Sequence, residues 1–340
     1  MTLVAIEGGG RALATVRAAG VPVREFGVSG LGSLRVVPRL IREGERRRGV
    51  IVTWAPSAHA VGALVARCTR TPHVVNWHRQ PGFPMTTRQS AGMRMAAKLG
   101  AGAIAFTQTQ IPDLVKLGMP KSRVRVVPNG TPEPKTSSLD RSAARRALGL
   151  RDQIVAVVVA RLRPEKRHTD LFEALALVRA GGQDVCVVVV GDGPLEAALR
   201  REVASMQIPV IFAGFQEDPS LYMIASDVVC LSSEFEALPM SLIEAGACAR
   251  PSVATDVGGT REIIVDGVTG LLVPTRDVRG LADALARISR DATLRNSMGI
   301  QARRRWEDRF SFDAMVDAYL RLLLGIQGPP AQWLPDGSAL

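Results

Sequence analysis

The sequence has few aromatic residues and no long apolar run. Phe, Trp and Tyr make up 4% of the 340 residues, and charged or polar residues interrupt every apolar stretch before it reaches 18 residues. A membrane-spanning helix needs about 20 apolar residues, so we expect none. The first ten residues turn polar too early for a secretory signal peptide. These absences favour a cytoplasmic protein, and the 46% of hydrophobic residues excludes general disorder.

Cysteine is also scarce. The four cysteines, Cys68, Cys186, Cys230 and Cys248, show no CxxC spacing, which is a common signature of a metal or redox site. Cys186 and Cys230 lie inside apolar runs typical of buried strands, where a small and weakly polar side chain fits well. We therefore predict buried free thiols that form no disulfide and bind no metal.

Positive charge is abundant but unevenly distributed. Residues 1–135 contain 20 Lys and Arg against 6 Asp and Glu, whereas residues 136–340 contain 23 against 26. The densest basic run is Arg35–Arg48. Such asymmetry indicates an anionic partner for the first half, either nucleic acid or an anionic membrane surface. The run lacks the aromatic side chains that stack on bases, which argues against nucleic acid. A solvated basic face explains the charge equally well.

Short apolar runs alternate with helical stretches, a pattern typical of parallel sheets with helices on both faces. The series occurs twice and predicts an α/β protein of two doubly wound, Rossmann-like domains facing each other across a cleft. Strands are expected at 2–6, 21–26, 50–54, 73–77, 103–106 and 124–127, and again at 154–159, 185–190, 210–212, 228–231, 252–255 and 270–273. Helices are expected at 57–68, 87–99, 168–180, 194–205, 240–248, 279–288, 292–308 and 312–324.

The domain boundaries follow from composition. The stretch Thr131–Asp140 is rich in Pro and Ser without periodicity, so it is predicted to be a linker. We assign residues 1–132 to the first domain, 133–150 to the linker, 151–310 to the second domain, 311–325 to a final amphipathic helix and 326–340 to a flexible tail.

The most informative stretch is Ser233–Ala245, in which Glu236 and Glu244 flank a turn that enters a helix through Pro239. Proline is favoured in a first helical turn because its missing N–H would be unpaired there anyway. The open N–H groups and partial positive charge of a helix N-terminus suit a phosphate. Neighbouring carboxylates can accept hydrogen bonds from sugar hydroxyls, so the stretch predicts a site for a nucleotide-sugar.

Two cations follow the first strand of the second series. Arg161 and Lys166 lie beyond the carboxyl end of that strand, which is where ligands bind in doubly wound sheets. Arginine offers a bidentate fork and lysine a point charge, and together they suit a diphosphate. Ordinary solvated loop cations are the alternative. The paired carboxylates in the same domain favour the diphosphate.

Weaker signals occur at other strand ends. The turn Gly191–Pro194 is more typical of a structural turn than of a ligand contact. Gly214 and Phe215 follow the next strand, where backbone groups could reach a nucleobase. Gly258-Gly259 could let the chain approach a phosphate or sugar closely. In the first domain, His78 follows a strand; a lone histidine is more often structural, but one facing a sugar phosphate could bond a donor hydroxyl.

In their order along the chain, these motifs resemble the retaining glycosyltransferases of the GT-B fold, and within them family 4 (group 1). The resemblance covers about Thr2 to Leu324 and is most specific in the second half. It rests on Arg161…Lys166, Gly191–Pro194, Gly214-Phe215, Ser233-x-x-Glu236-x7-Glu244-Ala245, Val257–Glu262 and Asp266–Leu271, with weaker support from His78 and Pro128–Gly130.

The resemblance implies that the catalytic residues are Glu236, Arg161, Lys166 and His78. Arg161 and Lys166 would neutralise the diphosphate, Glu236 would orient the donor sugar, and His78 would contact that sugar from the first domain. Further residues would bind the donor: Glu244 at the ribose, Gly214 and Phe215 at the base, the backbone of Leu238, Pro239 and Met240 at the sugar, and Gly191.

The implied reaction moves a sugar from a nucleotide-diphosphate sugar to a carbohydrate, lipid or small-molecule acceptor, with retention of the anomeric configuration. The cations and the helix N-terminus would stabilise the leaving diphosphate, so the reaction would need neither a metal ion nor a cofactor. A covalent intermediate on Glu236 is a less favoured alternative. The family also implies that the first domain takes the acceptor and that the helix at 311–325 braces it.

Several positions depart from the family pattern. Ala160, Ala237 and Ala249 stand where Gly is usual, and the methyl group of Ala237 would lie close to the donor sugar. Family members have a further strand and helix, on the order of 40 residues, before the segment that resembles residues 2–26, and the given sequence has no such unit. Either the start codon is placed too late, or the protein is shortened and its first domain lacks this strand and helix. The second hypothesis is therefore a non-catalytic or inactive nucleotide-sugar-binding protein. A basic nucleic-acid-binding protein is the third.

Overall fold

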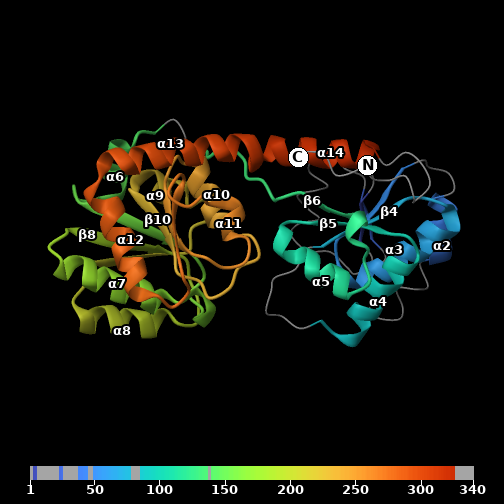
Figure 1. The fold of residues 1–340 in the computed structure, drawn as a ribbon, viewed down its shortest axis with the longest axis horizontal. Helices are drawn as coiled ribbons and strands as arrows, with labels where there is room; N and C mark the ends of the chain where they lie inside the picture. The colour runs from blue at the N-terminus through green and yellow to red at the C-terminus, as the bar shows by residue number, and fades with distance from the viewer. Residues whose placement is uncertain are drawn as a thin grey trace. The chain divides into compact units, whose positions relative to one another are not determined.

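The computed structural model describes residues 3–5, 23–25, 37–44, 49–77, 85–136 and 139–325. The chain divides into two compact units, each of which is shown in Figure 1. The N-terminal unit contains the described residues up to Val127 and those from Tyr319 onward, and the C-terminal unit contains Pro128–Ala318. The stretch expected to be a linker, 133–150, thus belongs to the C-terminal unit, and the helix expected at 311–325 contributes to both.

The N-terminal unit is built on a parallel sheet with the strand order β3-β4-β5-β6, and β1 and β2 form a separate parallel pair. Val75, Met93 and Leu114 are fully buried in its core. The strands are β1 (Leu3–Ala5), β2 (Val23–Glu25), β3 (Ile51–Thr53), β4 (His73–Asn76), β5 (Gly102–Ala105) and β6 (Val124–Val126). The described α-helices are α2 (Val37–Gly44), α3 (Pro56–Thr69), α4 (Thr87–Lys98) and α5 (Ile111–Lys116), and short 3-10 turns lie at Gln108–Gln110 and Lys121–Arg123.

The C-terminal unit contains a six-stranded parallel sheet in the order β12-β11-β10-β7-β8-β9. From β7 the chain adds strands in one direction to β9, and it then returns to place β10 on the other side of β7. This reversal is a topological switch point, where open α/β sheets bind their ligands. The strands are β7 (Ile154–Val159), β8 (Val185–Val190), β9 (Val210–Gly214), β10 (Val228–Leu231), β11 (Ser252–Thr255) and β12 (Gly270–Val273).

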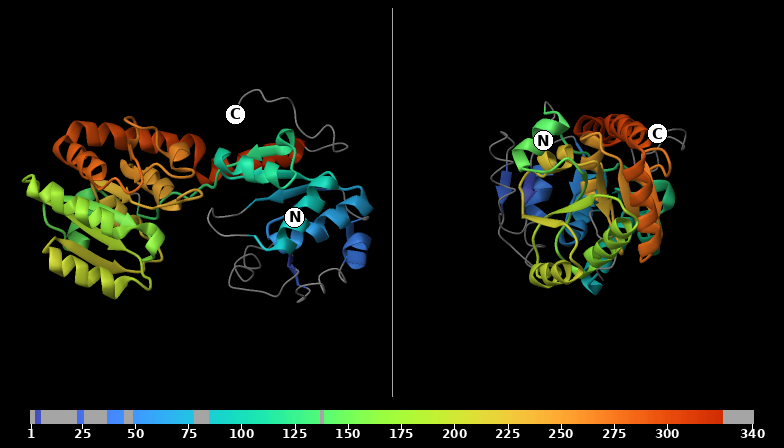
Figure 2. Two further views of the ribbon diagram at one scale, coloured as in Figure 1. Left: turned by 60° about the horizontal axis from the view of Figure 1, so that its bottom comes forward. Right: turned by 90° about the vertical axis from the view of Figure 1, so that its left-hand side faces the viewer.

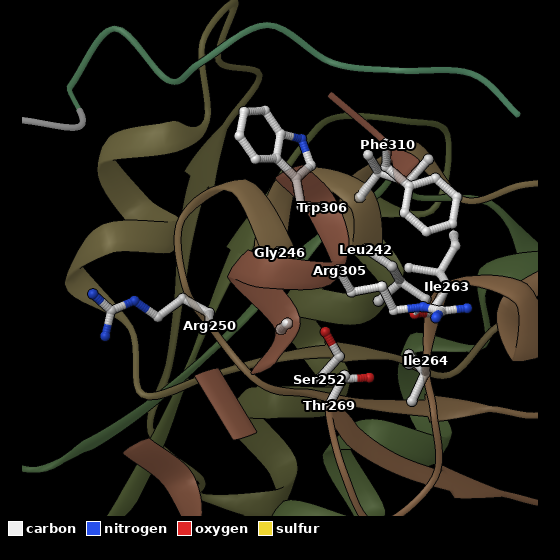
Figure 3. Close-up of a pocket in the computed structure, with 12 residues that line it drawn as sticks. Leu242, Gly246, Arg250, Ser252, Ile263, Ile264, Thr269, Arg305, Trp306 and Phe310 are labelled. Atoms are coloured by element: carbon white, nitrogen blue, oxygen red, sulfur yellow. Dashed lines mark hydrogen bonds between the residues drawn. The ribbon is translucent and has the colours of Figure 1, made fainter. Parts of the chain in front are cut away.

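Helices cover both faces of this sheet because successive strand residues point to opposite sides. Val158 and Val187 pack with α7, α8 and α12, whereas Val157 and Val229 lie on the face covered by α6, α9 and α10. Figure 1 shows α7 and α8 on the opposite side of the sheet from α9 and α10, and Figure 2 shows the same layers from two other sides. The helices are α6 (Arg141–Leu148), α7 (His168–Ala180), α8 (Glu196–Met206), α9 (Ser220–Ala225), α10 (Met240–Ala247), α11 (Thr260–Ile263), α12 (Val278–Arg290), α13 (Ala292–Arg309) and α14 (Phe312–Gly325).

The segment that leaves the N-terminal unit pairs with the segment that returns to it. Thr131 forms a parallel bridge with Ser311, its N–H donates to the Phe310 carbonyl (2.9 Å), and its hydroxyl accepts from the Trp306 indole (2.8 Å). Farther along α14, Tyr319 belongs to the N-terminal unit and its hydroxyl accepts a hydrogen bond from the Asn76 amide (2.8 Å). α14 is thus tied by hydrogen bonds at its start and in its second half.

The predicted α/β class and the parallel sheets are confirmed. Five strands of the second series have the expected limits, namely β7, β8, β10, β11 and β12. The most informative difference is α6, which lies within the predicted linker. Asp140 caps it by accepting a hydrogen bond from the Ala143 N–H (2.6 Å), and Gly149 ends it in the left-handed conformation. Ala144 is its one fully buried residue, so no apolar stripe reveals the helix in the sequence.

The predicted burial of the cysteines is confirmed for three of them and wrong for the fourth. All four thiols are free, and Cys186, Cys230 and Cys248 are buried, but Cys68 is exposed because it lies on the solvent-facing side of α3. Within the described part of the chain, no helix is long and apolar enough to cross a membrane. His78, the predicted tail 326–340 and much of the basic run Arg35–Arg48 lie outside the described residues.

Candidate functional site

The candidate site lies where β7 and β10 end, at the switch point of the C-terminal unit. β7 leads into the loop Ala160–Lys166, and β10 leads into Ser232–Pro239. These two strands are neighbours and parallel, so their carboxyl ends lie at the same edge of the sheet. The strand order alone therefore brings together two loops that are some 70 residues apart in the sequence.

The centre of the site is an ion pair between Lys166 and Glu236. The Lys166 ammonium donates to Oε1 of Glu236 at 2.6 Å, and the Ser233 hydroxyl donates to the same oxygen at 2.7 Å. The Glu236 side chain is 5% exposed and that of Lys166 is 18% exposed. A buried carboxylate is costly unless it is paired and hydrogen-bonded, and here both conditions are met.

Backbone contacts hold the two loops together. The Ser232 hydroxyl donates to the carbonyl oxygens of Lys166 (3.0 Å) and Arg167 (2.9 Å), and the Glu234 N–H donates to the Glu165 carbonyl (2.8 Å). Arg167 adopts a left-handed conformation at the start of α7, with φ of 48°. This turn ends the short 3-10 segment Pro164–Lys166 and leaves Lys166 beside the β10 loop.

Gly258 packs directly against the backbone of the loop that carries Glu236. It has φ of +53°, and a Cβ at this position would lie 1.7 Å from the Glu236 carbonyl oxygen. Gly259 N–H also donates to the Ala237 carbonyl (3.0 Å). The close approach that these glycines permit is thus to the protein's own loop, and the expected approach to a phosphate or sugar stays a prediction.

Replacing Gly258 with Ala is expected to displace the Glu236 loop and to lower the free energy of unfolding by about 3 kcal/mol, because the methyl group overlaps backbone atoms. In a unit of this size the melting temperature should fall by roughly 6–12 °C. Gly267→Ala is the matched control: it also has positive φ (+75°), but its Cβ would meet no atom within 4 Å. Equal melting temperatures for the two variants would contradict the packing role of Gly258.

Arg161 and the glycine turn lie at the same edge of the sheet. Arg161 is exposed, and within the described residues no ion pair holds its guanidinium. Gly191 and Gly193 pack against the loop that carries Arg161: a Cβ on Gly191 would lie 2.0 Å from the Ala160 carbonyl oxygen, and one on Gly193 would lie 2.5 Å from that of Leu162. Gly191 therefore has a packing role, and its predicted contact with the donor stays a prediction.

The N-terminus of α10 adjoins the ion pair. Pro239 is its N-cap residue in an extended conformation, and Leu238 before it is buried. Among the described residues, the backbone N–H groups of Met240 and Ser241 have no acceptor. A helix start with open N–H groups can bind an anion. At the start of α10, the buried Lys166–Glu236 pair places further polar groups beside these N–H groups.

Glu244 lies one turn inside α10. Its burial, together with the negative charge of Asp218, raises the pKa of Glu244 from 4.5 to about 7. No hydrogen bond from the described residues reaches its carboxylate. A carboxyl group with such a pKa changes its protonation state near neutral pH, and a ligand that donates hydrogen bonds to it would favour the ionised form.

The remaining predicted residues are less closely grouped. Gly214 is the last residue of β9, the edge strand two positions from β7, and Phe215, which follows it, is 69% exposed. The Gly214 carbonyl accepts a hydrogen bond from the Gly191 N–H (2.8 Å), which links this end of the site to the glycine turn. Sequence reasoning did not single out Ser232 and Thr255, whose hydroxyls donate to backbone carbonyls of the two loops at the site. A serine or threonine after an apolar run carries no distinguishing signal in the sequence.

A sheet with the 3-2-1-4-5-6 strand order and a polar site at its switch point is the arrangement typical of nucleotide-binding α/β units. Two family models match the chain. Residues 140–305 match "Glycosyl transferases group 1", and residues 2–133 match "Glycosyltransferase Family 4". The chain therefore belongs to the group 1, family 4 glycosyltransferases of the GT-B fold, as the sequence motifs indicate.

Curated relatives and solved structures agree with this assignment. The chain is 35% identical over 211 residues to a D-inositol 3-phosphate glycosyltransferase of Kribbella flavida, covering 58% of this chain and 50% of that protein. It is 28% identical over 218 residues to the N-acetyl-alpha-D-glucosaminyl L-malate synthase of Bacillus anthracis, covering 63% and 57%. The chain thus spans about half the length of these relatives.

Among solved structures, Anabaena Alr3699/HepE in complex with UDP superposes with a TM-score of 0.82 at 23% identity, covering 95% of this chain and 92% of that one. The same protein in complex with UDP-glucose gives a TM-score of 0.75 at 24% identity, covering 94% and 90%. At these identities the likeness establishes the fold.

Proposed function

We propose that the protein transfers a sugar from a nucleotide-diphosphate sugar to a carbohydrate, lipid or small-molecule acceptor, with retention of the anomeric configuration. The observation that carries the proposal is the buried Lys166–Glu236 pair beside the open N-terminus of α10, at the switch point of the six-stranded parallel sheet. This arrangement supplies both a cation for a phosphate and a carboxylate for sugar hydroxyls.

In the proposed reaction the bond between the sugar and the diphosphate breaks, and negative charge develops on the terminal phosphate. Lys166, Arg161 and the N–H groups at the start of α10 stabilise that charge, which lowers the barrier to departure. The oxygen of the acceptor hydroxyl bonds to the anomeric carbon on the face that the phosphate leaves, and its proton passes to the leaving phosphate, so the configuration is retained. The reaction as proposed uses no metal ion and no cofactor.

The donor is held along the carboxyl edge of the sheet. Glu244 accepts hydrogen bonds from the ribose hydroxyls, Glu236 and the backbone at Leu238–Met240 orient the sugar, and the base lies near Gly214-Phe215. Gly191 holds the loop that carries Arg161. His78 contacts the sugar from the N-terminal unit, which takes the acceptor. The UDP and UDP-glucose complexes of Anabaena Alr3699/HepE support UDP-glucose as the first donor to test.

A calorimetric and thermal-shift screen with UDP-, GDP- and ADP-sugars tests the donor site. One donor at 100 times its Kd should stabilise the protein by about 2.7 kcal/mol, and its hydrolysis or transfer should release the nucleoside diphosphate whether or not EDTA is present. Product NMR then reads the anomeric configuration. If no nucleotide-sugar binds, the proposed function is wrong; if one binds without turnover, the protein is a nucleotide-sugar-binding protein.

The basic N-terminal half motivates a second part of the proposal, association with the cytoplasmic face of an anionic membrane that carries the acceptor. Flotation with neutral vesicles and with vesicles containing phosphatidylserine tests it. The protein should float with the anionic vesicles only, and equal flotation with both kinds would overturn the membrane proposal without affecting the donor site.

A further inference from the structure

Both hydrogen bonds to the Glu236 carboxylate end on the same oxygen. Lys166 and Ser233 donate to Oε1 at 2.6 and 2.7 Å, and none of the described residues donates to Oε2. The terminal torsion of a glutamate is soft and nearly two-fold, so a carboxylate held by a single donor can present either oxygen. The second, neutral donor removes this freedom because it holds Oε1 from a fixed position.

Ser233 is itself held in place. Its side chain is fully buried, and the Thr255 hydroxyl at the end of β11 donates to the Ser233 carbonyl oxygen at 2.6 Å. A serine hydroxyl has a single proton, and here that proton is given to Glu236. The neighbouring Ser232 holds the backbone of Lys166 in the same manner. Two consecutive serines after β10 therefore fix the two partners of the ion pair separately.

We propose that Ser233 is a positioning residue that locks Oε1 of Glu236, so that Oε2 is the oxygen offered to a hydroxyl of the donor sugar. The inference rests on the proposed function, since it assigns a role within the donor-sugar site. Ser233 does not touch the donor. It acts through Glu236, and its loss should affect the sugar-dependent step and leave nucleotide binding unchanged.

The test compares Ser233→Ala with wild type by measuring turnover of UDP-glucose, or of the donor that the screen identifies, and the Kd for its nucleoside diphosphate alone. The variant should lose about 10- to 100-fold in kcat/KM, as expected for a lost hydrogen bond to a charged group, while the nucleotide Kd changes less than twofold. Ser233→Thr keeps the hydroxyl and should recover most of the turnover.

Ser226→Ala is the matched control, because Ser226 is equally buried and donates one hydrogen bond, to the Met223 carbonyl (2.8 Å), at the other end of β10. It should lose stability but not turnover per folded molecule. Turnover by Ser233→Ala within twofold of wild type would overturn the inference, as would a nucleotide affinity that falls together with turnover.

If the wild-type protein binds no nucleotide-sugar, the proposed function is wrong. The role of Ser233 can still be tested, because one measurement needs no ligand. A double-mutant cycle of Ser233→Ala and Glu236→Gln, measured by thermal unfolding, reports their coupling without any ligand. We expect the two single changes to be non-additive. Additive effects would show that Ser233 does not hold the Glu236 carboxylate.

Discussion

Replacing Lys166 with Met is expected to reduce kcat/KM for sugar transfer by about 10²- to 10³-fold, because the variant removes a preorganised cation from the departing diphosphate. The same change should destabilise the protein by about 3–5 kcal/mol, since it leaves the Glu236 carboxylate buried with only the Ser233 hydroxyl as its partner. Steady-state kinetics and thermal unfolding measure the two effects separately.

The double variant Lys166→Met/Glu236→Gln separates folding from chemistry. It removes the unpaired buried charge, so the melting temperature should return toward that of wild type, while activity stays low. Lys121→Met, at an exposed position in the N-terminal unit, serves as a control for loss of a single positive charge. If the double variant remains as unstable as Lys166→Met, the ion pair does not account for the stability of this loop.

The affinity for UDP-glucose is expected to rise about tenfold between pH 6 and pH 8. The pKa of Glu244 is raised to about 7 by burial and by Asp218, so only about a tenth of the free protein carries the carboxylate at pH 6 and about nine tenths carries it at pH 8. If the ribose hydroxyls bind the carboxylate, the apparent Kd for UDP-glucose is inversely proportional to the fraction of free protein in which Glu244 is ionised. Titration calorimetry at several pH values measures the dependence.

Glu244→Gln provides the control for this pH dependence. The variant has no carboxyl group at this position, so its affinity for UDP-glucose should be weak and nearly constant between pH 6 and pH 8.

The stability of the wild-type protein should change with pH in the opposite sense to its affinity for UDP-glucose. Because the folded-state pKa of Glu244 lies above its ordinary value of 4.5, the folded state holds its proton to higher pH than the unfolded chain, and the contribution of Glu244 to stability is lost as pH rises through 7. Glu244→Gln should therefore melt higher than wild type at pH 8 and close to it at pH 4. A flat affinity profile in the wild-type protein would contradict the role of Glu244.

The strands of the C-terminal unit were predictable from the sequence because they are continuous apolar runs of four to six residues, such as Ile154–Val159 and Val185–Val190. A strand buried on both faces must read in this way. Apart from α10, which the sequence predicts at 240–248, the short helices were not predictable. α6 is rich in arginine and is stabilised by Arg145, which pairs with the buried carboxylate of Asp227 some 82 residues away. Neither its composition nor its periodicity carries that information.

The sequence by itself determined the chemistry that is available: two carboxylates flanking Pro239, two cations after the first strand of the second series, and a helix that begins where a phosphate can be bound. The tertiary structure decided which of these groups meet. Lys166 contacts Glu236 because β10 returns to the side of β7, and strand order is a property of the whole sheet. The buried Ser233 and the backbone of Gly258 then decide how the carboxylate is held, since both act through close packing that no local pattern records.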